Sequence, residues 1–126
     1  MPNNRTEIRP IIKGLDLKVT KSTEEKFQNE TLRPILKMQH DLLVKYFRSY
    51  LLSRKCRFEN LTSLKKEAFI DAAFKKDIAF KSELKGMVLG HFTVFEYTIY
   101  SSNKNDFNKR ILAMIQQRIK SVIELF

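Results

Sequence analysis

Hydrophobic side chains recur at helical spacing over two long stretches of the chain. When residues 32–55 are laid out at about 100° per residue, their apolar side chains fall on one broad arc and most charged side chains on the opposite arc. Residues 104–125 show the same separation of apolar and polar faces. Each stretch is predicted to form a long amphipathic helix. The wide arc of 32–55 indicates a central helix with more than one neighbour.

Capping residues predict where the first helices begin. Ser22 and Glu25 have the spacing of a capping box, in which each side chain accepts a hydrogen bond from a free backbone N–H of the other residue. Pro34 is tolerated only in a first helical turn, because it lacks an N–H. Thr31 is therefore expected to cap the long helix, and a separate short helix is expected to end near Asn29.

Further caps and the scarcity of turn residues predict the fold class. Thr62 and Asp77 are suited to cap two helices within residues 62–90, and Thr93 with Glu96 forms a second capping box. No alternating strand pattern occurs, and three Gly and three Pro are too few for the turns of an all-β fold. We predict an all-α bundle of about five helices, with residues 22–126 as a single helical domain and residues 1–21 as an irregular N-terminal arm.

The cellular compartment is predicted from the lack of a long apolar stretch and from the single cysteine. No stretch is apolar enough for a signal peptide or a membrane span, so we expect a cytoplasmic protein without membrane contact. The single cysteine, Cys56, cannot form an internal disulfide, which fits a reducing compartment. Its neighbours Lys55 and Arg57 are cations that can lower the pKa of a thiol. The favoured interpretation is a small residue near a helix end, because no histidine stands near it in sequence as a base.

The net charge of +10 is concentrated in one part of the chain. Residues 31–60 hold seven Lys and Arg against two acidic residues, a net charge of +5. On the predicted helix the basic residues Arg33, Lys37, Arg48 and Lys55 share one face, although Asp41 lies within it. Such a basic stripe predicts contact with nucleic-acid phosphates as one alternative. A solvated basic face is the other interpretation.

Two glycines and two histidines were weighed as parts of a site. Gly86 and Gly90 stand four residues apart on one helical face, which predicts close packing of another helix or, as an alternative, a ligand approaching the backbone beside His91. Neither His91 nor His40 has the paired spacing of a helical metal site. No metal and no cofactor are therefore predicted.

Polar and aromatic residues point to an interface. Arg118 lies inside the apolar face of the last helix, where a guanidinium must extend to solvent or find a carboxylate, and Gln39 has a similar position in the first long helix. Ten Phe and four Tyr exceed what a five-helix core is expected to bury. The residues predicted to lie at an interface are Tyr97, Tyr100, Arg118 and Phe126.

The segments 31–37, 84–86, 90–93 and 108–111 resemble a family of small bacterial proteins of unknown function, over most of residues 22–126. Some members of that family are labelled glyoxalase, which implies a metal-dependent enzyme built from βαβββ units. This chain has neither the strands nor the spaced His and Glu ligands of such an enzyme. The resemblance implies a bacterial cytoplasmic protein and no functional residues.

The function predicted from these observations is binding rather than catalysis. No phosphate-binding glycine loop, nucleophile elbow or paired-carboxylate pattern occurs, which makes an enzyme the weaker class. The first hypothesis is a non-enzymatic helical protein that acts by self-association or by binding a protein partner. The alternative is nucleic-acid binding through the basic stripe.

Overall fold

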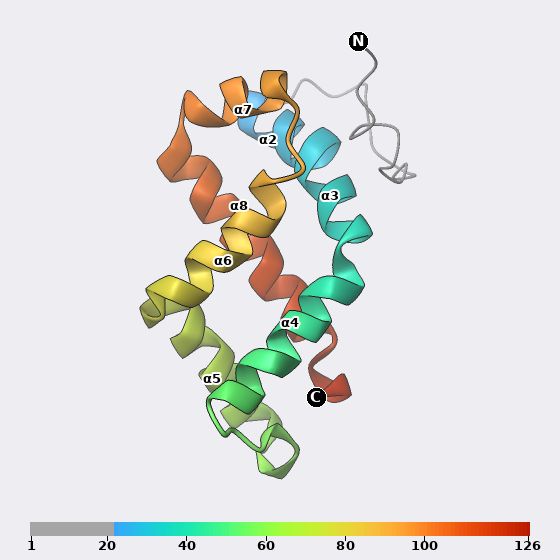
Figure 1. Ribbon diagram of the computed structural model, residues 1–126, viewed down its shortest axis with the longest axis vertical. Coiled ribbons are helices and arrows are strands. Elements are labelled where there is room, and N and C mark those ends of the chain that lie inside the picture. Colours follow the sequence, from blue (N-terminus) through green and yellow to red (C-terminus); the bar gives the residue numbers. More distant parts are fainter. Residues whose placement is uncertain (1–21) are drawn as a thin grey trace.

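The computed structural model describes residues 22–126, so the predicted arm over residues 1–21 lies outside the described residues. Every regular element of the described part is a helical segment, and no strand occurs in it, which confirms the predicted all-α class (Figure 1). The elements are α2 (Thr23–Phe27), the π-helical turn η1 (Gln28–Leu32), α3 (Arg33–Met38), α4 (His40–Ser53), the 3₁₀ turn η2 (Phe58–Asn60), α5 (Ser63–Lys76), α6 (Ile78–Leu89), α7 (Val94–Ser101), α8 (Lys104–Ser121) and the 3₁₀ turn η3 (Ile123–Leu125).

The chain does not start a new helix at Thr31, contrary to the prediction. It stays helical from α2 through η1 into α3, and the N–H of Arg33 bonds to the carbonyl of Gln28, five residues earlier. This wider turn accommodates Pro34, which has no N–H and whose ring would otherwise meet the carbonyl of Glu30. Sequence reasoning treated Pro34 as a helix boundary and did not foresee a π-helical turn.

The predicted single helix over 32–55 is wrong in its course, because the helix kinks at Gln39. This residue has φ −92° and ψ 5°, and it separates α3 from α4. Its Nε2 donates to the carbonyl oxygen of Met87 in α6 at 2.9 Å, so this polar side chain of the apolar face is bonded within the chain. Gln39 is buried, and its Oε1 has no hydrogen-bond partner among the described residues.

The central helix is α8, not the segment 32–55 that the apolar arc indicated. It packs against α4, α5, α6 and α7, and Figure 1 shows it passing behind α6 to reach α4. Phe107, Ile111, Ile115 and Ile119 are buried at four-residue intervals along it. The helix ends at Ser121, earlier than the predicted 125, and the chain then forms η3.

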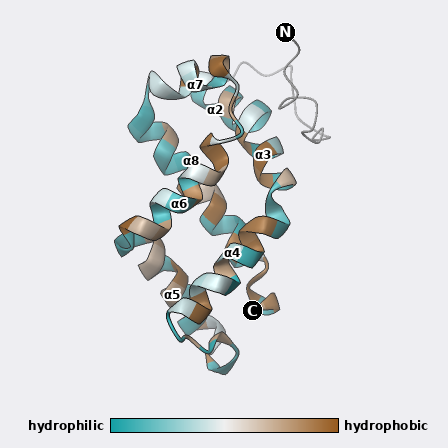
Figure 2. Cartoon of the chain, in the orientation of Figure 1, coloured by the Kyte–Doolittle hydropathy of each residue, from teal (hydrophilic) through white to brown (hydrophobic). Residues whose placement is uncertain are grey.

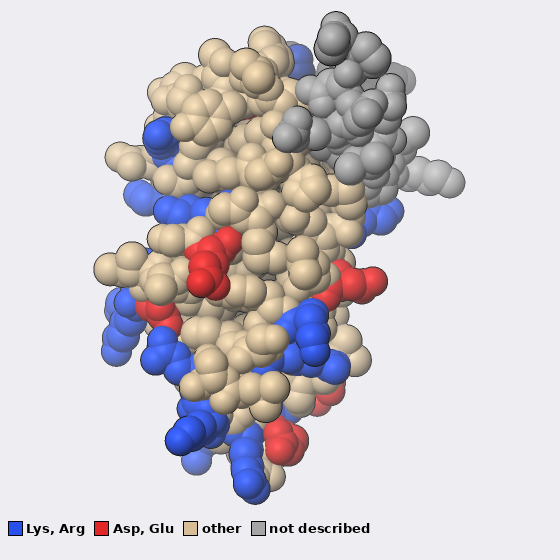
Figure 3. Space-filling view, in the orientation of Figure 1, with Lys and Arg blue, Asp and Glu red and all other residues tan. Residues whose placement is uncertain are grey.

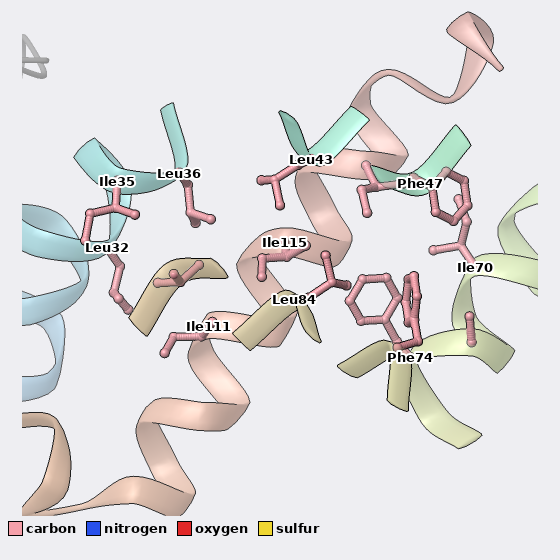
Figure 4. Packing of buried hydrophobic residues seen from close by; sticks show 14 of the residues in the cluster. Leu32, Ile35, Leu36, Leu43, Phe47, Ile70, Phe74, Leu84, Ile111 and Ile115 are labelled. Carbon is pink, nitrogen blue, oxygen red and sulfur yellow. The ribbon is translucent and has the colours of Figure 1, made fainter. Parts of the chain in front are cut away.

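Aliphatic residues fill the middle of the core and aromatic residues fill its two ends. Figure 4 shows Leu43, Leu84, Ile111 and Ile115 meeting between the helices, with Phe47 to one side. Hydrophobic residues follow the inner faces of the ribbons, as Figure 2 shows for α4 and α6. One aromatic group consists of Phe27, Phe92, Tyr97, Tyr100 and Phe107, and the other of Tyr46, Phe47, Tyr50, Phe58, Phe69, Phe74, Phe80 and Phe126.

The predicted caps position the shorter helices. Thr62 accepts from the N–H of Lys65, and Asp77 accepts from the N–H of Phe80 at 3.1 Å. Thr93 forms a complete capping box at the start of α7. None of the helices within residues 22–126 is both long enough and apolar enough to cross a bilayer.

Candidate anion-binding groove and candidate interface residues

A groove of about 460 Å³ lies between α3 and α8 and brings together predicted residues from two parts of the chain. We call it the cation groove, because, among the described residues, its lining includes three basic side chains and no acidic one. Its lining consists of Gln28, Arg33, Leu36, Lys37, Met114, Gln117, Arg118 and Ser121.

Arg118 is half-buried in the wall of the cation groove. No Asp or Glu of the described residues lies within 4 Å of its guanidinium, so the carboxylate partner that the sequence analysis named as one outcome is absent there. Its Nη1 lies 3.4 Å from Nδ1 of His40. Burial lowers the pKa of Arg118, although a guanidinium in a protein keeps its proton at neutral pH. The groove wall therefore carries a positive charge that burial disfavours.

Arg33 and Lys37 stand one helical turn apart on α3 and form the opposite wall. Both are exposed, and neither lies within 4 Å of a described carboxylate. Elsewhere the fold does pair its cations, as in the Arg110–Asp106 pair at 3.0 Å and the Lys120–Asp71 pair at 2.6 Å. Most Lys and Arg side chains of residues 22–126 form no such pair, so what distinguishes the cations of the groove is that they line one groove together.

The predicted basic stripe is not continuous. Arg48 lies on α4, where its Nη2 donates to the carbonyl oxygen of Leu125 at 2.8 Å and its guanidinium lies 5.8 Å from the ring centre of Phe126. Lys55 follows the end of α4 at φ 54° and does not line the groove. Two features separate these cations along the chain: the backbone departs from helical angles at Gln39, between α3 and α4, and α4 ends at Ser53, before Lys55.

The lining side chains are suited to hold an oxyanion. A guanidinium offers two parallel N–H groups that match two oxygens of one phosphate or carboxylate, and an ammonium offers a compact charge. Gln117 adds a neutral amide donor on α8, whereas the hydroxyl of Ser121 donates to the carbonyl oxygen of Arg118 at 2.6 Å. Sequence reasoning identified Arg33, Lys37 and Arg118 but did not place them together, because their approach depends on how α3 packs on α8.

The predicted close packing at Gly86 and Gly90 is wrong for the described chain. A Cβ atom added to Gly86 would have no heavy atom of the described residues within 4 Å beyond its own neighbouring turn. At Gly90 the nearest contact would be the carbonyl oxygen of Gly86 in the same helix, at 3.3 Å. Gly86 is exposed in the last turn of α6 and Gly90 is exposed at the C-cap of that helix, and among the described residues neither glycine nor His91 lines the cation groove.

Two of the four predicted interface residues point inward. Tyr100 is buried, and its hydroxyl donates to Oδ1 of Asn108 at 2.5 Å. Phe126 packs on the ring of Phe47, with ring centres 4.9 Å apart. Tyr100 and Phe126 differ from the prediction for the same reason: the core packs around more aromatic side chains than the composition suggested it could bury. Tyr97 is exposed on α7, as an interface residue would be.

The sequence analysis missed the most exposed apolar residues of α7, Val94 and Phe95. They are 86% and 73% exposed. The signal was present, because a helix that begins at Thr93 and buries Tyr100 turns positions 94 and 95 away from the core. We call Val94, Phe95 and Tyr97 the α7 patch.

A second polar cluster, also missed, joins α4 to α6 beside pockets of about 480 and 410 Å³. Tyr50 donates to Oδ2 of Asp77 at 2.7 Å, Arg54 pairs with the same carboxylate, and the Tyr46 hydroxyl donates to Glu83. Burial, reinforced by the bonded carboxylates, raises the pKa of Tyr46 and of Tyr50. Asp77 is fully engaged by these donors, which makes it a structural connection between the two helices.

Two further candidate sites are a reactive thiol at Cys56 and a metal site. Burial, with Glu59 nearby, raises the pKa of the Cys56 thiol, so the cations beside it in sequence do not activate it. Within residues 22–126 no group of three or more His, Cys, Asp or Glu side chains is arranged to hold a metal ion.

Comparisons with known proteins add no assignment. The chain matches no protein-family model, no curated protein and no solved structure. The family resemblance described from the sequence segments therefore stays a prediction, and the functional argument depends on the geometry alone.

Proposed function

We propose that the chain binds the phosphate groups of a nucleic-acid strand in the cation groove. The observation that carries this proposal is the meeting of three cations on the walls of one groove, Arg33, Lys37 and Arg118, none of which has a carboxylate partner within residues 22–126. Like charges held near one another repel, so this arrangement costs free energy until an anion enters. Phosphate oxygens supply the missing negative charge and accept the hydrogen bonds that the groove offers.

A long polyanion is favoured over an isolated phosphate group because the positive charge extends beyond the groove. The whole chain has a net charge of +10, and exposed cations such as Arg48 lie outside the groove. Charge outside the groove attracts a strand that continues past it and does little for a single phosphate. The basic side chains of the groove are suited to contact the phosphate backbone of a nucleic-acid strand. Such contacts do not distinguish one base from another, so binding with little sequence preference is expected.

Binding of a labelled single-stranded oligonucleotide, measured by fluorescence anisotropy over a range of salt concentrations, tests this proposal. Inorganic pyrophosphate serves as the small competitor. The double variant Arg33→Gln, Lys37→Gln removes two exposed cations without disturbing the core, and the double variant Lys75→Gln, Lys76→Gln on α5, which also removes two exposed cations, is the matched control. Each cation removed from the groove is expected to lower the slope of log affinity against log salt by about 0.7.

The outcomes separate the two sources of phosphate. Weaker and less salt-dependent oligonucleotide binding by the double variant, with the control unchanged, supports the proposal. Equal losses in the double variant and the control would show that general charge, not the groove, binds the strand. Binding of pyrophosphate without binding of the oligonucleotide would overturn nucleic acid as the partner.

A further inference from the structure

Two aromatic side chains remain exposed in this fold, and both lie on α7. The chain has ten Phe and four Tyr, all within the described residues, and Phe95 and Tyr97 are the two that the core leaves exposed. Val94 stands beside them at 86% exposure. An apolar surface of this kind is costly in water, since each exposed aromatic side chain forgoes the burial that stabilises the others. The α7 patch therefore calls for a partner surface.

A groove beside the α7 patch offers such a surface. It has a volume of about 460 Å³ and lies between α7 and α2, with Phe95 on its edge. Its apolar lining includes Phe27 and Ile99, and its outer wall is formed by Lys26 and Glu30 from α2 and η1. An exposed ring and a groove that can receive a ring thus lie next to each other on one face.

The charges of this face are compatible with a second copy of the same chain. α7 carries no basic residue, and its one acidic residue, Glu96, is buried and bonded to Thr31 and Thr93. One cation reaches the patch from α8, where the ammonium of Lys104 lies 5.9 Å from the ring centre of Tyr97. Figure 3 shows the upper front face, over α7, as largely uncharged, whereas Lys and Arg gather in the lower half. Two molecules of net charge +10 repel each other least where such a face is presented to its equal.

The groove wall is also self-complementary. Lys26 and Glu30 are exposed, stand one turn apart and have opposite charges, and they do not pair with each other within 4 Å. In a two-fold interface every contact occurs twice, so an arrangement that brings Lys26 of one copy to Glu30 of the other forms two such pairs. An unrelated partner needs no such symmetry, which favours a second copy as the occupant.

We propose that two copies of this chain associate through the α7 patch, with Phe95 of each copy entering the groove between α7 and α2 of the other. This goes beyond the proposed nucleic-acid binding and does not depend on it, since the cation groove lies between α3 and α8. α7 has eight residues and a length of about 12 Å, so the interface is small and the dimer is expected to be concentration-dependent.

Sedimentation equilibrium of the full chain over a wide concentration range tests the proposal. The wild-type chain is expected to pass from monomer to dimer, and Phe95→Ser is expected to stay monomeric at every concentration. Leu64→Ser on α5 is the matched control, because it removes an apolar side chain of similar exposure, 78%, outside the patch. Circular dichroism of each variant checks that the helices are retained. A monomeric wild-type chain, or equal dissociation by both variants, would overturn the proposal.

A charge exchange tests the two-fold arrangement itself. Lys26→Glu places acidic residues opposite each other across the interface and is expected to weaken the dimer. Combining it with Glu30→Lys restores opposite charges and is expected to return association toward the wild-type level. A double variant that is as monomeric as the single one would rule out this pairing and with it the proposed geometry.

Discussion

At the scale of single residues, burial of the charged Arg118 side chain disfavours the folded state. Arg118 is a half-buried cation without a carboxylate within the described residues, and burial lowers its pKa. An apolar side chain of similar length would fill the same space without that cost. A residue retained against stability is typical of a binding site.

The variant Arg118→Met is therefore expected to be more stable than the wild type, by about 1 kcal/mol, while its affinity for an oligonucleotide falls. Urea denaturation and anisotropy measure the two effects. Arg110→Met is the contrasting variant: Arg110 pairs with Asp106 and bonds to Gln28, so its removal should lower stability. A less stable Arg118→Met chain would indicate a structural role for the guanidinium.

Gly86 also lowers stability, but no contact of the described structure requires a glycine at this position in the helix. A Cβ there meets nothing within 4 Å in the described structure, and Ala loses less conformational freedom on folding than Gly. Gly86→Ala is expected to raise the free energy of unfolding by about 0.5–1 kcal/mol in urea denaturation. A loss of stability or of association would instead reveal a surface that packs on this glycine outside the described contacts.

At the scale of elements, capping residues do more than start helices. Asp77 caps α6 through the N–H of Phe80 and also accepts hydrogen bonds from Tyr50 of α4 and from Arg54, the residue that follows α4. The hydrogen bond from Tyr50, followed by that from Phe80, lowers the pKa of Asp77 below its ordinary value. The ionised carboxylate thus joins two helices.

The carboxylate of Asp77 predicts that the free energy of unfolding depends on pH. A carboxyl whose pKa is lowered by folding stabilises the native state above its unfolded pKa of about 3.9, and that contribution is lost as the pH falls through the lower folded value. Asp77→Asn keeps a capping side chain but has no charge to titrate. It is expected to be less stable than the wild type at pH 7, with the difference shrinking in acid. Urea denaturation at neutral and acidic pH measures this, and a constant difference would contradict it.

The elements also show what the sequence could predict. Thr62, Asp77 and Thr93 mark helix starts correctly because a cap is a local hydrogen bond between residues two or three positions apart. The kink at Gln39 could not be predicted, since its side chain bonds to Met87, 48 residues away. The π-helical turn before Pro34 also escaped prediction, because a proline is accommodated either by ending a helix or by widening it.

The sequence identified the basic residues of the cation groove but did not predict that they lie in one groove. Arg118 was identified because a charge in an apolar helical face is unusual in any fold. Its neighbours Arg33 and Lys37 were identified as part of a stripe that the kinked helix does not form. Their common groove depends on packing between residues about 80 positions apart, for which one sequence carries no signal.

At the scale of the molecule, aromatic rings concentrate at the two ends of the core and aliphatic residues lie between them. Phe47 is completely buried and touches the rings of Tyr50, Phe58, Phe80 and Phe126. Its position joins α4 to η2, α6 and the C-terminal segment. One side chain therefore connects four segments that are distant in sequence.

Phe47→Ala is expected to lower the free energy of unfolding by about 3–5 kcal/mol, a large part of the stability of a domain of this size. Tyr46→Ala on the adjacent, half-exposed position should cost less. Urea denaturation followed by circular dichroism gives both values. Similar losses for the two variants would mean that the aromatic group at this end does not depend on Phe47.

The kink at Gln39 sets the rotational register between the two ends of the molecule. A helix turns by about 100° for each residue, so deleting the kinked residue would rotate the chain before it by that amount relative to α4. Arg33 and Lys37 would then leave the wall opposite Arg118, although every cation would still be present in the sequence. Spacing across position 39, more than the number of basic residues, decides whether the chain has a cation groove.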